Sequence, residues 1–148
     1  MSKIAYLTAA WPVWSETFIR QEIELIQKNN ELEIFPIALF SGNMEVDDTM
    51  PDVFILDPGQ TAAVPGKASI LKNWVPGMIR RELSQFKHRE MMIKFIQVLK
   101  AIKATHIHAA FADLPSVLVK AAAKELQIPY SVSIHAADVL LNSANDKY

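Results

Sequence analysis

The fold is decided by residues 4–40, which read IAYLTAAWPVWSETFIRQEIELIQKNNELEIFPIALF. The first four residues are a short apolar run without alternation, which is typical of a strand buried on both faces of a parallel sheet. From Ser15 the apolar residues recur every three or four positions, which predicts an amphipathic helix ending near Asn30. Residues 32–40 predict a second strand, in which Pro36 indicates a bulge or an edge-facing position.

The carboxyl-terminal part of the chain repeats this pattern. Residues 106–110 and 130–134 predict strands, and residues 114–126 predict an alanine-rich helix between them. Strands that alternate with helices predict an α/β, Rossmann-like fold with a doubly wound, mostly parallel sheet. Ligands of such sheets bind beyond the carboxyl ends of the strands, where the strand order reverses. The loops at 9–17, 109–114 and 135–140 are therefore the candidate binding loops.

The middle of the chain is harder to interpret. Residues 41–76 hold three of the four glycines and four prolines, which predicts a loop with one short strand at 53–56. The pattern of residues 77–103 is helical, but its apolar stripe changes side near residues 87–89. This shift predicts two helices with a break at that point.

Composition limits the class of protein. The chain has 148 residues, 51% of them hydrophobic, which suits one domain spanning residues 1–148 with a sizeable core. It contains no cysteine, so disulfides and thiolate chemistry are excluded, and a cytoplasmic location is expected. The first apolar run stops at Thr8, too early for a signal peptide or a membrane span. The first loop lacks the glycines of a dinucleotide or P-loop site, and no nucleic-acid partner is expected.

The start of the first predicted helix is the first candidate site. Ser15 can cap this helix, Glu16 suits the positive end of its dipole, and Thr17 follows them. One interpretation is simply a well-capped helix. The other is that the backbone amides at this terminus face an anionic or hydroxyl-rich ligand.

Histidines at the strand ends form the second candidate site. His106 and His108 point to the same side of a strand, as ligands of some metal sites do, but the spacing does not demand a third ligand from Asp113 or His135. We therefore expect no metal, with one histidine in the core and His108 reaching the crevice. His135 follows a strand and precedes Asp138 by three residues, so the imidazole can donate to a sugar hydroxyl or phosphate while the carboxylate orients it. The alternative is a structural histidine beside a helix-start aspartate.

The chain resembles the amino-terminal domain of family 4 retaining glycosyltransferases, in the branch of bacterial exopolysaccharide and colanic-acid-type biosynthesis. The resemblance rests on four motifs and on their order and separations, namely Ser15-Glu16-Thr17-Phe18-Ile19 with Glu22-Ile23, residues 106–112 (HIHAAFA), Pro129-Tyr130-Ser131, and His135-Ala136-Ala137-Asp138. It implies the GT-B arrangement, in which two Rossmann-like domains face a cleft. The acceptor binds mainly to the amino-terminal domain and the nucleotide-sugar mainly to the carboxyl-terminal one. It also implies no metal and no cofactor besides the nucleotide-sugar co-substrate.

The resemblance also assigns roles to residues. His135 would be the catalytic residue, against the transferred sugar. The substrate-binding residues would be Ser15, Glu16, Thr17, His108, Phe111 and Asp138. The glycine-rich first loop of many relatives is replaced here by Trp11-Pro12-Val13-Trp14-Ser15-Glu16.

The expected partners follow from the same resemblance. Because the sequence stops at Tyr148, the nucleotide-sugar domain is expected in cis or in trans, and the chain alone should not transfer sugar. The acceptor is expected to be a glycan or a lipid-linked molecule. The alternative is a non-catalytic glycan- or protein-binding module of the same fold.

Basic residues are concentrated between Lys67 and Lys103. This stretch has nine lysines and arginines and two glutamates, a net charge of +7, while the whole chain carries −1 and the remainder therefore −8. Arg89, Lys94 and Lys100 are predicted to lie opposite the apolar face of their helix, as in a helix that binds an anionic membrane surface. A peripheral location on the inner face of the cell membrane would follow. The alternative is an ordinary solvated face.

Overall fold

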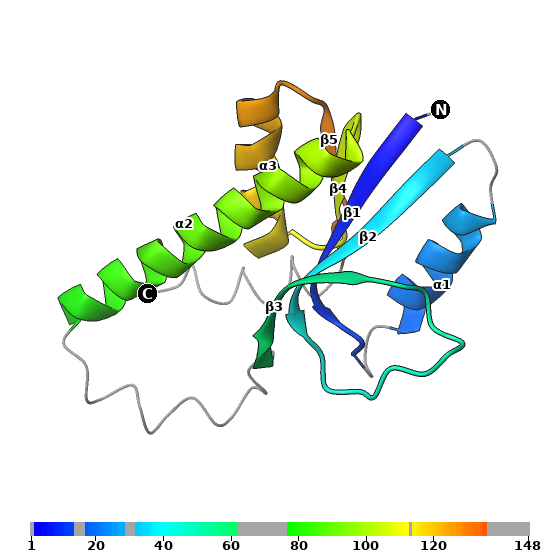
Figure 1. Ribbon diagram of the computed structural model, residues 1–148, viewed down its shortest axis with the longest axis horizontal. Coiled ribbons are helices and arrows are strands. Elements are labelled where there is room, and N and C mark those ends of the chain that lie inside the picture. Colours follow the sequence, from blue (N-terminus) through cyan, green and yellow to red (C-terminus); the bar gives the residue numbers. More distant parts are fainter. Residues whose placement is uncertain (1, 14–16, 29–31, 62–76, 113, 136–148) are drawn as a thin grey trace.

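The computed structural model describes residues 2–13, 17–28, 32–61, 77–112 and 114–135, with the side chains of 58, 60–61 and 77–88 left out. Its described strands form a five-stranded, all-parallel sheet in the order β3-β2-β1-β4-β5 (Figure 1). The strands are β1 (Ser2–Trp11), β2 (Leu32–Ser41), β3 (Phe54–Thr61), β4 (His106–Ala109) and β5 (Tyr130–Val132). The helices are α1 (Thr17–Gln27), α2 (Gly77–Ile102) and α3 (Leu114–Leu126).

The sheet is doubly wound, and the handedness of its crossovers explains why. The connection from β1 through α1 moves outward to β2, whereas the connection from β3 through α2 returns past β1 to β4. Right-handed crossovers that run in opposite directions place their helices on opposite faces of the sheet. Accordingly α1 lies on one face and α2 and α3 on the other (Figure 1). The predicted Rossmann-like α/β fold is confirmed, and its switch point lies between β1 and β4.

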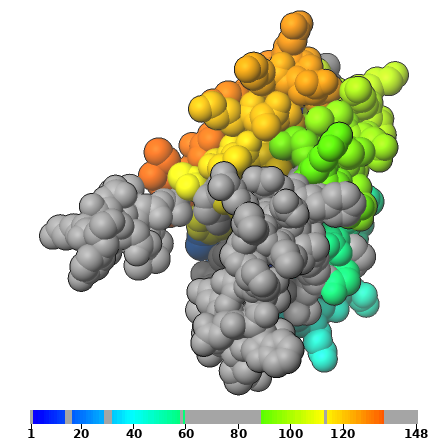
Figure 2. Space-filling model, turned by 90° about the vertical axis from the view of Figure 1, so that its left-hand side faces the viewer, coloured from blue at the N-terminus to red at the C-terminus, as the bar shows by residue number. Residues whose placement is uncertain are grey.

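Each face of the sheet has its own apolar core. The larger core lies under α2 and α3, where Phe95, Leu99 and Val119 pack on Leu7 and Ile107. The two helices adjoin each other, and Figure 2 shows the surface of α3, in yellow to orange, beside the second half of α2, in green. The smaller core lies under α1 and includes Tyr6, Trp11, Ile19 and Ile23. Along β1, Ala5 and Leu7 go to the larger core and Tyr6 to the smaller one, as the period of two requires, whereas Trp11 at the end of the strand departs from this alternation.

The prediction of two helices over residues 77–103 was wrong, because α2 is one helix of 26 residues. After Gly77 the helix contains no proline or glycine, and most of its residues are good helix formers. Backbone hydrogen bonding therefore continues although the apolar stripe changes side. The described buried residues of α2 are Met91, Phe95 and Leu99, which all belong to its second half. No helix in the described part of the chain is long and apolar enough to span a membrane.

Pro36 is accommodated without the bulge that its sequence position suggested. The register of β1 with β2 runs without interruption through the pair of Tyr6 and Pro36. On the other side of β2, the pairing with β3 begins only at Ile37 and Phe54. The irregularity of β2 lies instead between Phe40 and Ser41, opposite β3.

A tight backbone contact fixes the loop that leaves β1. The amide of Gly42 donates to the carbonyl of Trp11 at 2.8 Å, and the amide of Asn43 donates to that of Pro12 at 3.0 Å. The peptide bond between Trp11 and Pro12 is cis. A Cβ atom at position 42 would overlap the backbone of Pro12, so only glycine fits. This contact holds the end of β2 against the loop at the carboxyl edge of the sheet.

Candidate functional site

The switch point brings together segments that are far apart in the sequence. The chain leaving β4 stays hydrogen-bonded to β1, because the amide of Ala110 donates to the carbonyl of Leu7 at 2.8 Å. The chain leaving β5 stays beside β4 in the same way, through the amide of Ser133 and the carbonyl of Ala109 at 2.9 Å. These bonds place residues 110–112 and 133–135 next to the carboxyl end of β1, where a doubly wound sheet binds its ligands.

His135 is held at this edge by a backbone hydrogen bond. Its Nε2 atom lies 3.0 Å from the carbonyl oxygen of Ala110. Because a carbonyl oxygen only accepts, Nε2 carries the proton in this bond. In the neutral ring Nδ1 is then the acceptor, so the bond to Ala110 fixes both the tautomer and the orientation of the imidazole.

Two phenylalanine rings pack against this imidazole. The ring centroids of Phe18 and His135 are 5.1 Å apart, those of Phe111 and His135 are 4.9 Å apart, and the two phenylalanines meet edge to face at 5.9 Å. Such distances and tilts are those of favourable aromatic pairs. Phe18 comes from the first turn of α1, Phe111 from the segment after β4 and His135 from the segment after β5. We call these three residues the aromatic cluster.

The aromatic cluster lies at the surface. Phe18 is 39% exposed, and Phe111 and His135 are partly buried. An apolar surface with an oriented imidazole in it is the usual composition of a small-molecule site, in which a few polar groups fix the ligand's orientation.

A second group of polar side chains lies on the same side of the sheet as α1. His108 Nδ1 lies 2.8 Å from Ser131 Oγ, and its Nε2 lies 3.1 Å from Ser133 Oγ. His106 Nε2 also lies 2.8 Å from Ser131 Oγ. Since this hydroxyl has one proton, it can donate to only one of the two histidines and must accept from the other, so their tautomers are coupled. We call these two histidines and two serines the histidine–serine network.

The surroundings of His108 favour its neutral form. Partial burial lowers the pKa of His108 below its ordinary value of 6.5, the negative charge of Glu22 opposes this effect, and His106 adds to it. The Tyr6 ring lies 5.1 Å from the His108 ring, and the Tyr6 hydroxyl donates to Glu22 Oε2 at 2.7 Å. His108 is thus a hydrogen-bonded group of a half-buried network.

The predicted site residues are only partly brought together. Phe111 and His135 meet in the aromatic cluster, and Thr17 is the exposed first residue of α1, directly before Phe18. His108 lies in the histidine–serine network, which reaches the cluster through Ser133, two residues before His135. Ser15, Glu16, Asp113 and Asp138 lie outside the described residues.

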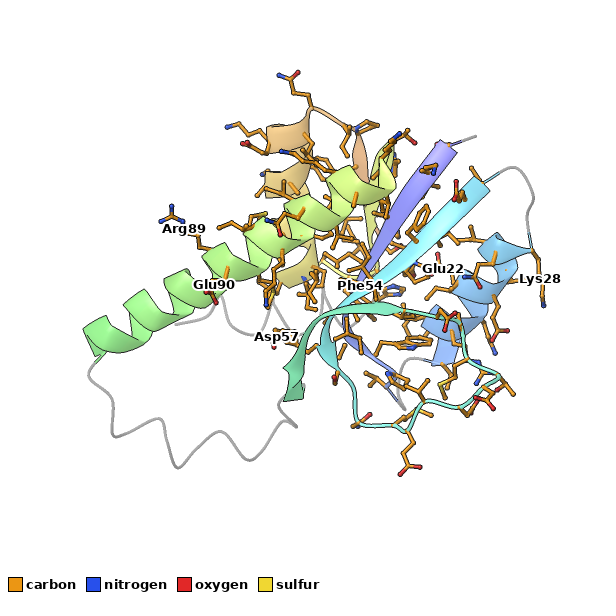
Figure 3. The ribbon with its side chains drawn as sticks, viewed as in Figure 1. Glu22, Lys28, Phe54, Asp57, Arg89 and Glu90 are labelled. Atoms are coloured by element: carbon orange, nitrogen blue, oxygen red, sulfur yellow. The ribbon has the colours of Figure 1, made fainter. Side chains whose placement is uncertain are left out.

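The three basic residues of the predicted membrane-facing patch are all exposed on α2. At about 100° per residue, Arg89 and Lys100 lie within about 20° of each other around the helix axis, whereas Lys94 lies about 120° from Lys100. Figure 3 shows Arg89 pointing away from the strands. Lys94 instead lines a groove beside β2 and β3. The predicted patch therefore consists of two neighbouring basic residues, Arg89 and Lys100, and a separate lysine, Lys94.

Sequence reasoning missed the serines and the role of Phe18 as a ring partner of His135. A signal for the serines is present, because the polar residues of 130–135 occupy the odd positions and those of 106–109 the even positions. Period-two alternation in two neighbouring strands predicts one polar surface. The contact between Phe18 and His135 has no comparable signal, since α1 and the segment after β5 meet only in the folded chain.

In the part of the chain that the structure describes, no group of three or more histidines and carboxylates could hold a metal ion. Neither a scan against protein-family models nor a search of the curated proteins finds a match for this chain. The sheet topology establishes the Rossmann-like fold.

Proposed function

We propose that this chain is the acceptor-binding domain of a retaining glycosyltransferase, which moves a sugar from a nucleotide-sugar to a glycan or lipid-linked acceptor. The observation that carries the proposal is the aromatic cluster at the switch point, with the imidazole of His135 oriented by the Ala110 carbonyl. The motifs shared with family 4 enzymes support it.

The chemistry of the aromatic cluster suits a sugar. A sugar ring presents apolar C–H faces and polar hydroxyl edges, so it needs both an apolar surface and hydrogen-bonding groups. Phe18 and Phe111 supply the apolar surface, and the half-buried His135 supplies an imidazole whose ring orientation is fixed. In this proposal His135 contacts the transferred sugar, and the nucleotide-sugar domain closes the cleft from the other side.

The main test is His135→Ala in the enzyme assembled with its nucleotide-sugar domain. Turnover should fall at least tenfold, equivalent to about 1.4 kcal/mol of barrier. The melting temperature should hardly change, because His135 is partly exposed and meets the smaller core at its edge, through Phe111 and the Ala110 carbonyl. Lys124→Gln is the control, since it alters an exposed side chain of α3 outside the cluster and should keep turnover close to wild type. Equal losses of stability and activity for His135→Ala would instead indicate a structural histidine.

A second test uses the chain alone. Because the donor site is assigned to the other domain, calorimetry against a panel of nucleotide-sugars should detect only weak binding. A dissociation constant in the micromolar range or tighter for one of them would contradict the assignment. Tight binding of a glycan by the isolated chain, together with no effect of His135→Ala on turnover, would favour the non-catalytic binding module.

A further inference from the structure

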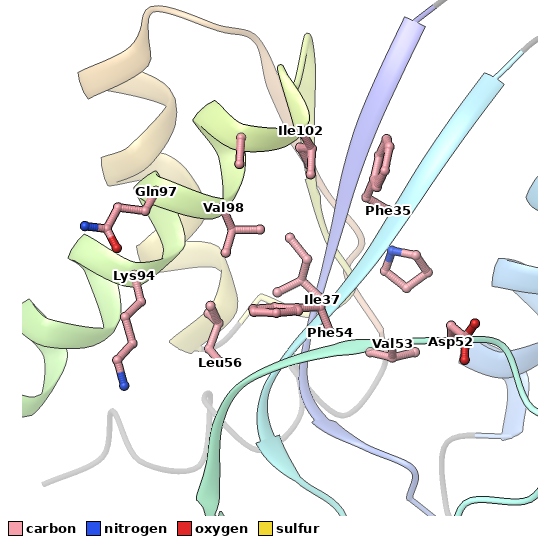
Figure 4. A pocket seen from close by; sticks show the side chains of 12 residues that line it. Phe35, Ile37, Asp52, Val53, Phe54, Leu56, Lys94, Gln97, Val98 and Ile102 are labelled. Carbon is pink, nitrogen blue, oxygen red and sulfur yellow. The ribbon is translucent and has the colours of Figure 1, made fainter.

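A groove lies on the α2 side of the sheet, away from the aromatic cluster. It runs between α2 and the strands β2 and β3, and its volume is about 800 Å³ (Figure 4). This volume lies within the range of roughly 300–1,000 Å³ that is usual for small-molecule sites. Neither the candidate catalytic residue nor the histidine–serine network borders it.

The lining of the groove is almost entirely apolar. The strands form part of its floor, with Phe35 and Ile37 from β2 and Phe54 and Leu56 from β3. Helix α2 forms its wall, with Val98, Ala101 and Ile102. Phe54 is 56% exposed, which is unusual for a large aromatic side chain on a strand. An exposed apolar surface of this kind, inside a concave site, indicates a binding groove for a hydrocarbon group.

Two charged residues lie on opposite sides of the groove, Lys94 on α2 and Asp52 just before β3 (Figure 4). Within the described residues Lys94 has no ion pair, hydrogen bond or ring contact. Lys3, by contrast, is paired with Glu33 at 3.3 Å. The unpaired ammonium of Lys94 complements an anion, while the carboxylate of Asp52 repels one. An amphiphile would therefore bind with its anionic head beside Lys94.

We propose that the groove binds one molecule of a long-chain anionic amphiphile, of the alkyl phosphate class. The hydrocarbon chain lies on Phe35, Phe54 and Ile102, and the phosphate lies beside Lys94 with the Gln97 amide as a second donor. A flat bilayer surface does not enter a concave groove. A partner strand is disfavoured because β3 carries Asp57 and its pairing with β2 is irregular at Phe40 and Ser41. This binding is independent of the sugar transfer proposed above.

The first experiment is calorimetry of the chain with dodecyl phosphate below its critical micelle concentration. One-to-one binding is expected, with decyl and octyl phosphate progressively weaker. A fully buried methylene is worth about 0.8 kcal/mol, or about fourfold in affinity, and partial burial in an open groove should give about two- to fourfold per methylene. Inorganic phosphate should not bind measurably. No binding of dodecyl phosphate, or binding that does not depend on chain length, would overturn the proposal.

The second experiment uses three variants on α2. Ala101→Trp fills the groove from an exposed position and should weaken dodecyl phosphate at least tenfold. Lys94→Gln should weaken dodecyl phosphate several-fold but leave the neutral dodecanol unchanged. Lys100→Gln is the matched control, because it removes an exposed lysine of the same helix that does not line the groove. Thermal melts confirm that each variant is folded.

Comparing Lys94→Gln with Lys100→Gln distinguishes binding in the groove from nonspecific electrostatic attraction to the basic surface of α2. If Lys94→Gln and Lys100→Gln weaken dodecyl phosphate equally, the attraction comes from the basic surface of α2 and the proposal is wrong. It is also wrong if folded Ala101→Trp binds as the wild type does. A selective effect of Lys94→Gln together with loss of binding in Ala101→Trp supports it.

Discussion

The two faces of β4 differ in burial and in polarity. Ile107 and Ala109 point to the side of α2 and α3 and have no exposed surface. His106 and His108 point to the other side, where they are half-buried and hydrogen-bonded to serines. On that side α1 packs mainly against β2, and in the described part of the chain no helix covers β4 and β5. Alternate residues of one short strand therefore face an apolar core on one side and a hydrogen-bonded polar network on the other.

The largest expected effect concerns the apolar face. Phe95 of α2 is fully buried in the core that it shares with Ile107, so Phe95→Ala should lower the free energy of unfolding by about 3–5 kcal/mol. Ile93→Ala is the control on the same helix, because Ile93 is 49% exposed and its truncation should cost little. Urea denaturation of both variants measures the difference. Similar losses for the two would mean that α2 does not stabilise the sheet as the contacts indicate.

A smaller loss is expected on the polar face. Ser131→Ala removes the hydroxyl shared by His106 and His108 and leaves ring nitrogens without that partner, which should cost about 1–3 kcal/mol. Ser133→Ala breaks one bond to His108 and should cost less. Ser131→Thr keeps a hydroxyl and should recover part of the loss. If Ser131→Ala unfolds like the wild type in urea, water replaces the serine and the network does not contribute to stability.

The pH dependence of stability should separate the two faces. Burial lowers the pKa of His108 in the folded state, so the unfolded chain takes up a proton first as the pH falls. The contribution of His108 is therefore fully present above the ordinary pKa of 6.5, decreases as the pH falls below it, and levels off below the folded pKa. His108→Gln should flatten this part of the curve, when unfolding free energies are compared between pH 7.5 and 5.5. An unchanged slope in that variant would assign the effect to other groups.

The smallest effect per residue is expected at the basic surface of α2. We propose that this surface contacts an anionic membrane, where each basic residue contributes about 1 kcal/mol. Co-sedimentation with anionic vesicles should show retention at low salt and release as salt is raised. Because Arg89 and Lys100 lie close together around the helix axis, replacing both with Gln should remove most of the retention, and Lys94→Gln should remove less. If the folded chain ignores anionic vesicles at low ionic strength, the surface is only solvated.

The sequence by itself determined the class of the fold and the parallel direction of its strands. Short apolar runs that alternate with helical spacing require strands buried on both faces, which only a parallel sheet covered by helices provides. The prediction for α3, residues 114–126, agrees with the structure at both ends, because its apolar pattern is local and unbroken. The candidate loops at the carboxyl edge followed from the same reasoning, because ligands of doubly wound sheets bind beyond the carboxyl ends of the strands.

Only the tertiary structure decided which residues meet in these loops. Phe18, Phe111 and His135 lie in three separate segments, and their contact depends on the hydrogen bonds that continue the sheet beyond β4 and β5. The continuity of α2 was also undecided, because a shifting apolar stripe does not show whether backbone hydrogen bonding stops. Local periodicity determines which element forms, whereas contacts between distant segments are fixed only when packing brings those segments together.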